Sequence, residues 1–131
     1  MGYSDVVKNT TFQIIFTELA LNALEHGVLK MNSIIKNTED GIAQWEYLRG
    51  IALSKIEYGF INISIKRIQP DIVCLKVSDS GNGFNTKDIN IINDFSLVNK
   101  YGRGIKLIAS LAEKINYSTL GNSCACIIKI S

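Results

Sequence analysis

The chain has 131 residues, of which 47% are hydrophobic and 20% charged, a composition typical of one globular domain with an apolar core. Its net charge of +2 comes from 14 basic and 12 acidic residues, a balance that does not by itself imply nucleic-acid binding. No apolar segment is long enough to cross a membrane, and three cysteines without a secretory signal favour reduced thiols. We therefore expect a cytoplasmic domain that binds neither membrane nor nucleic acid.

The first half of the chain is predicted to hold two helices. Residues 5–29 carry apolar side chains at helical spacing. These side chains are Phe12, Ile15, Phe16, Leu19, Ala20, Ala23 and Leu24. Residues 39–56 form the second predicted helix, with Trp45 and Tyr47 expected in the core or at an interface. Gly50 lies within this second helix and weakens the prediction.

The strands begin where the apolar period changes from 3.6 to two. Ile61, Ile63 and Ile65 alternate with polar residues, which predicts a strand over residues 60–67 with one buried face. Residues 72–79 read as a second strand of the same kind. Because the connection between the two is short, we expect an antiparallel hairpin.

The last third of the chain is predicted to hold a polar loop, a helix and two strands. The loop covers residues 85–101 and the helix residues 102–115, and the strands cover residues 116–120 and 124–130. Hairpins combined with helices indicate an α+β fold with helices on one face of a mostly antiparallel sheet. We expect one domain that spans residues 1–131.

A first polar cluster interrupts the apolar first helix in the stretch "ELALNALEHG". Glu18 and Asn22 are four residues apart and therefore lie one turn apart on one helix face. An amide oxygen suits Mg²⁺, and a carboxylate beside it can deprotonate an attacking hydroxyl or water. Glu25 is expected to be solvated, and His26 to pack or cap near the helix end or to contact a phosphate.

Two further clusters are rich in glycine: "DSGNGF" after the second strand and "GRGI" at the third helix. Asp79 ends a buried strand, where a carboxylate needs a donor such as the exocyclic amine of a purine. Gly81 and Gly83 let a planar base approach the backbone. Gly102 and Gly104 open a helix whose free N–H groups can receive phosphate oxygens.

In this order, the three clusters resemble the N, G1 and G2 boxes of the Bergerat-fold ATPase superfamily, which includes gyrase, heat-shock protein 90, histidine kinases and the mismatch-repair MutL proteins. The resemblance covers nearly the whole chain, from about residue 12 to residue 130. It implies a two-layer α/β sandwich with a mixed, mostly antiparallel sheet. It also implies a short ATP lid between the second and third clusters, with ATP and Mg²⁺ as cofactors.

On the phosphate side of the site, the resemblance implies that Glu18 is the catalytic base and Asn22 the Mg²⁺ ligand. Gly102, Arg103 and Gly104 would hold the phosphates. Arg103 could equally bind a partner protein.

On the adenine side, the resemblance implies that Asp79 binds the base and that Gly81 and Gly83 shape the pocket. The family usually has a Gly-Thr pair before its last strand, whereas this chain reads "GNSCACI". Ser123 is therefore expected to replace the threonine hydroxyl.

Within the superfamily, "ELxxNAxxHG" and the short lid most resemble the anti-sigma-factor serine kinases. This resemblance implies an enzyme that uses Mg²⁺-ATP to phosphorylate a STAS-type anti-sigma antagonist, or that binds a sigma factor, in bacterial signalling. Two alternatives stay open. One is a non-catalytic ATP-binding docking module of a response regulator, and the other is the ATP-binding domain of a histidine kinase.

The chain departs from these kinases ahead of the first polar cluster, where they usually have a strand and a further helix. Only 17 residues precede Glu18 here. We therefore expect a fragment of a longer chain, with an uncovered sheet edge that invites homodimerisation.

Overall fold

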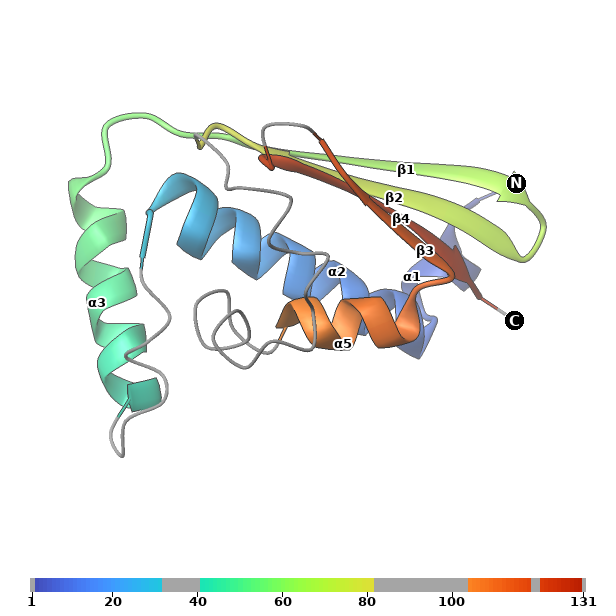
Figure 1. Cartoon of the computed structure of the whole chain (residues 1–131), viewed down its shortest axis with the longest axis horizontal. Coiled ribbons are helices and arrows are strands. Elements are labelled where there is room, and N and C mark those ends of the chain that lie inside the picture. The colour runs from blue at the N-terminus through green and yellow to red at the C-terminus, as the bar shows by residue number, and fades with distance from the viewer. Residues whose placement is uncertain (1, 32–40, 82–103, 119–120, 131) are drawn as a thin grey trace.

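The computed structural model describes residues 2–31, 41–81, 104–118 and 121–130. The elements are α1 (Ser4–Val7), α2 (Thr10–Asn22), the π-helix η1 (Ala23–Val28), α3 (Gly41–Lys55), β1 (Ile61–Gln69), β2 (Ile72–Asp79), α5 (Gly104–Leu111), β3 (Lys114–Tyr117) and β4 (Ser123–Lys129). Figure 1 shows α1, α2 and α5 together on one face of the sheet, with α3 standing apart beyond the end of α2. The predicted α+β fold with helices on one sheet face is confirmed.

The described strands form one sheet in the order β1-β2-β4-β3, and every pairing is antiparallel. The expectation of a mixed sheet is therefore wrong for the part of the chain that the structure describes. The predicted hairpin is present as β1 and β2. On β1 the expected alternation is incomplete, because Ile61 and Ile65 pack against the core while Ile63 is 45% exposed. This strand lies at the sheet edge, where fewer neighbours cover it.

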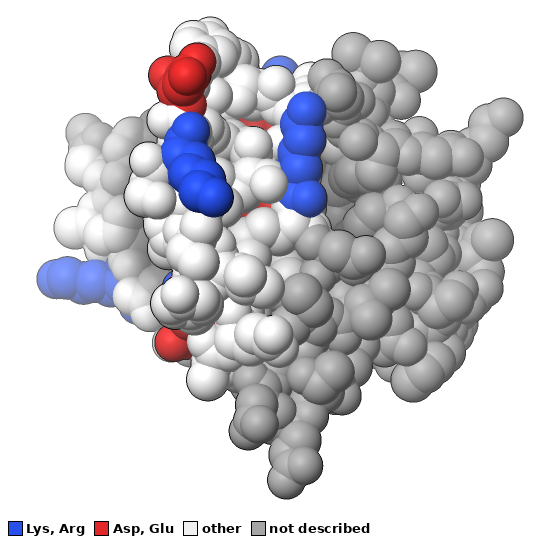
Figure 2. Space-filling model, turned by 90° about the vertical axis from the view of Figure 1, so that its left-hand side faces the viewer, with Lys and Arg blue, Asp and Glu red and all other residues white. Residues whose placement is uncertain are grey.

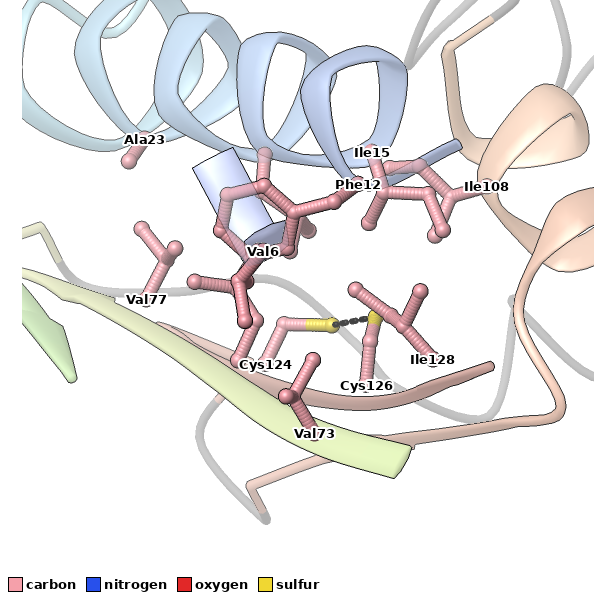
Figure 3. Close-up of a cluster of buried hydrophobic side chains, with 12 residues drawn as sticks. Val6, Phe12, Ile15, Ala23, Val73, Val77, Ile108, Cys124, Cys126 and Ile128 are labelled. Carbon is pink, nitrogen blue, oxygen red and sulfur yellow. Dashed lines mark hydrogen bonds between the residues drawn. The ribbon is translucent and has the colours of Figure 1, made fainter. Parts of the chain in front are cut away.

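The core lies between α2, α5 and the sheet. Figure 3 shows Ile15 of α2 and Ile108 of α5 facing one another above the side chains of the sheet. The sheet contributes cross-strand pairs, among them Leu75 with Cys126 and Val73 with Ile128. Full burial of a side chain of this size stabilises the fold by about 1.5–3 kcal/mol.

The three cysteines are free thiols, as expected. Cys124 and Cys126 are buried on one face of β4 with their Sγ atoms 3.9 Å apart (Figure 3). The hydrogen bond with Cys126, together with burial, raises the pKa of the Cys124 thiol. These two residues therefore serve as small apolar members of the core. Among the described residues, no cluster of three or more His, Cys, Asp or Glu side chains could hold a metal ion.

The first predicted helix is interrupted near its start. Asn9 has extended backbone and caps α2, because its side-chain oxygen accepts a hydrogen bond from the Phe12 N–H at 2.9 Å. Its amide nitrogen donates to the Ile130 carbonyl at 2.8 Å, which ties the start of α2 to the end of β4. The apolar pattern did not reveal this break, because Val6 of α1 is buried in the same core as the apolar face of α2.

The third predicted helix, residues 102–115, ends earlier than predicted. It stops at Leu111, and Ile115 lies in β3 opposite Cys126. The Glu113 N–H donates to the Ile127 carbonyl at 2.8 Å, so pairing with β4 begins at once. Ile115 packs against the core from its place in β3, so an apolar residue stands where the helical period would also put one.

The second predicted helix is present as α3, but most of its surface is exposed. Of the α3 side chains that the structure describes, only Trp45 is buried, at 3% exposed. Tyr47 is 70% and Leu53 45% exposed, so neither lies in the core. Figure 2 views the molecule from the side of α3 and shows a few charged side chains separated by uncharged surface. No described helix is long and apolar enough to cross a membrane.

Candidate functional site

The first and second polar clusters meet where α2 and η1 end above the end of β2. A Cβ placed on Gly27 would lie 2.3 Å from the Asp79 Cγ and 2.5 Å from each carboxylate oxygen. Real Cβ atoms essentially never come this close to another heavy atom, so only glycine fits in this conformation. The glycine that ends the first cluster therefore leaves room for the aspartate that begins the second.

This contact lies on a stretch of π-helix. The Leu29 N–H donates to the Leu24 carbonyl at 2.8 Å, a bond that spans five residues. Lys30 follows with a φ of 55°, a left-handed conformation that ends the helix. Short π-helical segments inside or at the end of α-helices are frequent at functional sites, because the wider turn redirects side chains.

Asp79 is the central charged group of this junction. It continues the alternation of Val73, Leu75 and Val77, so it lies on the sheet face that the helices cover. Its Oδ1 accepts a hydrogen bond from the Gly81 N–H at 2.7 Å. Burial raises the pKa of this carboxyl, and the bond from Gly81 opposes that shift. An ionised carboxylate has about four acceptor sites. Among the described residues, only the Gly81 N–H donates to Asp79, so the carboxylate can accept a further hydrogen bond.

Gly81 is packed as tightly as Gly27. Its Cβ would lie 2.3 Å from the Gly27 carbonyl oxygen and 2.8 Å from the Asp79 Oδ1. The Asn122 side chain donates to the Gly81 carbonyl at 3.3 Å, and the Asn122 carbonyl accepts from the Asp79 N–H at 2.9 Å. The turn before β4 therefore joins the other two segments, and the junction is built from three distant parts of the chain.

Ser123 lies on the opposite side of the sheet from the Asp79 carboxylate. Its hydroxyl is 2.9 Å from the hydroxyl of Ser78, its cross-strand partner. Both residues alternate with Val77 and Cys124, which face the core. The residue opposite Asp79 is Asn122, which sequence reasoning did not select. Asn122 directly follows Gly121, the place of the threonine in the Gly-Thr pair of the resembled superfamily, and this position was the available signal.

Glu18 and Asn22 lie on the last two turns of α2, and both are partly buried. Neither side chain forms a hydrogen bond with another described residue, so both remain available to a ligand. Within α2 they are about 6 Å apart along the axis, and Gly27 lies five residues beyond Asn22, in η1. Glu18, Asn22 and Gly27, which contacts Asp79, therefore follow one another along one helical segment.

The third cluster is described only in part. Gly104 is the first residue of α5, which runs beside α2 in the opposite direction (Figure 1). Gly83, Gly102 and Arg103, together with the proposed lid, lie outside the described residues.

Glu25 is a residue that sequence reasoning misjudged. It is 2% exposed rather than solvated. Its Oε2 accepts from the Trp45 indole N–H at 2.5 Å and from the Arg49 guanidinium at 2.7 Å. Trp45 and Arg49 are four apart on α3 and share a helix face, a spacing that could have indicated a common buried partner.

His26, next to Glu25, packs near the helix end. Its Nδ1 lies 2.8 Å from the Met31 carbonyl, and its ring centroid is 5.8 Å from that of Trp45. This agrees with the packing or capping role expected for it.

Comparison with known proteins adds no relative: no protein-family model, curated protein or solved structure matches the chain. The function must therefore be argued from the site.

Proposed function

We propose that this chain is a Bergerat-type ATP-binding domain, and specifically a cytoplasmic Mg²⁺-ATP-dependent serine kinase of the anti-sigma-factor type. The observation that carries the proposal is the junction of Gly27, Asp79 and Gly81. Two motifs recognised separately in the sequence come into direct contact there, around a partly buried carboxylate. Such a contact is expected if both motifs serve one ligand.

The chemistry of the junction suits the adenine end of a nucleotide. A carboxylate in a partly apolar setting favours a neutral donor such as an exocyclic amine, because a bond of this kind offsets its desolvation. Its raised pKa has the same origin, since burial penalises the ionised form. The hydrogen bond from Gly81 fixes the carboxylate orientation before a ligand arrives.

The residues along α2 suit the phosphate end. Asn22 would offer its side-chain oxygen to Mg²⁺, an ion that takes few protein ligands and completes its shell with phosphate oxygens and water. When bound, the ion would neutralise phosphate charge. Glu18, one turn away, would accept the proton of the attacking serine hydroxyl. The substrate in this proposal is a serine of a STAS-type anti-sigma antagonist.

Two alternatives are separated by what happens to bound ATP. In a docking module, ATP is held without transfer, and the exposed Tyr47 and Leu53 of α3 would favour a role in protein contacts. In a histidine kinase, transfer goes to a histidine on a neighbouring dimerisation helix. The outer edges of β1 and β3 pair with no other described strand, and they would permit dimerisation in either case.

The kinase proposal is tested by separating binding from transfer. Labelled ATP and Mg²⁺ are incubated with the protein and with purified STAS-domain proteins, and labelled phosphoserine is measured. We expect Glu18→Ala to bind ATP with unchanged affinity and to lose at least about 100-fold in transfer rate. Gln13→Ala, an exposed change on the same helix, serves as the control. If the wild type and Glu18→Ala both bind ATP but neither transfers phosphate to any of these proteins, the docking module is favoured.

A further inference from the structure

Glu25 is a buried carboxylate that the proposed chemistry does not use. The Trp45 indole N–H and the Arg49 guanidinium, both from α3, donate hydrogen bonds to it. Removing a carboxylate from water is costly unless such donors surround it. The position of α3 and the burial of Glu25 therefore depend on one another.

Among the described residues, the attachment of α3 centres on Trp45, whose ring also lies 5.8 Å from that of His26, and on Arg49. Trp45 is its only buried side chain in the described part of the helix. Figure 1 shows α3 outside the two layers, beyond the end of the segment formed by α2 and η1. A helix whose described contacts centre on one buried side chain can be displaced by a binding partner without disturbing the main core.

The attachment point adjoins the proposed nucleotide site. Glu25 lies in η1, two residues before Gly27, where the Asp79 carboxylate leaves no room for a Cβ. The Glu25 backbone is held as well, because its carbonyl accepts from the Met31 N–H at 2.7 Å. A rotation of this π-helical turn that releases Glu25 from α3 would also move Gly27 against Asp79.

We infer that Glu25 is a positioning residue that couples the docking of α3 to the nucleotide site through the π-helical turn. This inference rests on the proposed function. With α3 in place, Trp45 and Arg49 hold the turn in the conformation that accommodates Asp79. A ligand that contacts Asp79 and stabilises this conformation must then strengthen α3 docking by the same free energy, since coupling is reciprocal.

The chain carries its own reporter of this coupling. Trp45 is its only tryptophan, and its indole N–H donates to Glu25. ATP with Mg²⁺ is titrated into the protein while calorimetry measures binding and Trp45 emission reports on α3. We expect the emission of the wild type to change with the same dissociation constant that calorimetry gives. Free N-acetyltryptophanamide in the same titration corrects for absorption by ATP.

Variants then separate coupling from a purely structural role. We expect Glu25→Gln and Arg49→Met to weaken ATP binding roughly tenfold, a typical coupling strength between linked sites, and to lose the emission change. Glu46→Gln makes the same substitution on an exposed residue next to Trp45 and should behave as wild type. Arg49→Lys keeps the charge and should recover part of the response. If Glu25→Gln does not fold, Arg49→Met carries the test, because the Arg49 side chain is 28% exposed.

Two results overturn the inference in distinguishable ways. If the wild type binds ATP but its Trp45 emission is unchanged and the variants bind equally well, the coupling is absent and the proposed function stands. If calorimetry detects no ATP binding by the folded wild type, the proposed function fails and the coupling fails with it.

Discussion

The two-layer core and α3 are held to the molecule by different kinds of interaction. Between α2, α5 and the sheet, contact is made by fully buried apolar side chains such as Ile15, Ile108 and Leu75. At α3, one buried side chain, Trp45, packs beside His26, and Trp45 and Arg49 both donate to the Glu25 carboxylate. The first kind of contact scales with buried area, and the second with the geometry of a few atoms.

This difference separates stability from adjustability. An apolar core tolerates changes of partner and direction but responds strongly to lost volume. The attachment of α3 combines one buried indole with a charged anchor, and the anchor fixes one orientation that can be released as a unit. The candidate site lies where the two regions meet, at the turn between Glu25 and Gly27.

The largest expected effect lies in the core. Ile15→Ala should lower the free energy of unfolding by about 2–5 kcal/mol, because it leaves a cavity at the centre of the helix–sheet contact. Leu53→Ala on exposed α3 should change it by no more than about 0.5 kcal/mol. Urea denaturation measures both. Equal effects would contradict the distinction between the two regions.

An intermediate effect is expected at the junction. Gly27→Ala should cost about 1–3 kcal/mol, because the added methyl group collides with the Asp79 side chain. Gly50→Ala is the matched control. Gly50 lies in α3, and a Cβ at this position would meet no atom within 4 Å. Removing this helical glycine should stabilise the protein by about 0.5–1 kcal/mol. Thermal unfolding measures both changes. If Gly27→Ala is stabilised like Gly50→Ala, Gly27 does not pack against Asp79 as described.

The smallest expected effect concerns the ionisation of Asp79. Burial raises its pKa in the folded state above the ordinary value of 3.8, so folding becomes less favourable as pH rises through that raised pKa. Asparagine cannot ionise and keeps an acceptor for the Gly81 N–H. Asp79→Asn should therefore be more stable than wild type near neutral pH by about 0.5 kcal/mol, a value kept small by solvent screening of a half-exposed group. Denaturant melts should show this difference vanishing below about pH 4.

The sequence predicted the elements well because apolar periodicity is a local property. Trp45 and Ile15 lie where the pattern placed them, and the short turn predicted the β1–β2 hairpin. The errors lie where non-local contacts decide: sheet pairing takes Ile115 out of a helix, and the Asn9 cap interrupts another.

The candidate site was only partly predictable for the same reason. Asp79 and Gly81 were selected from their turn, but their contact with Gly27 depends on how α2 crosses the sheet. Glu25 appeared solvated because its partners lie 20 and 24 residues further along the chain. Whether Asn122 or Ser123 shares the sheet face of Asp79 depends on strand register, which the sequence alone left open.

The most direct test of the proposed function is calorimetric titration of ATP, with and without Mg²⁺, into the wild type and into Asp79→Asn. We predict saturable binding by the wild type that Asp79→Asn abolishes while it remains folded. Undiminished binding by the variant would show that Asp79 does not recognise the nucleotide. Absence of binding by the folded wild type would contradict the assignment of this junction as an ATP site.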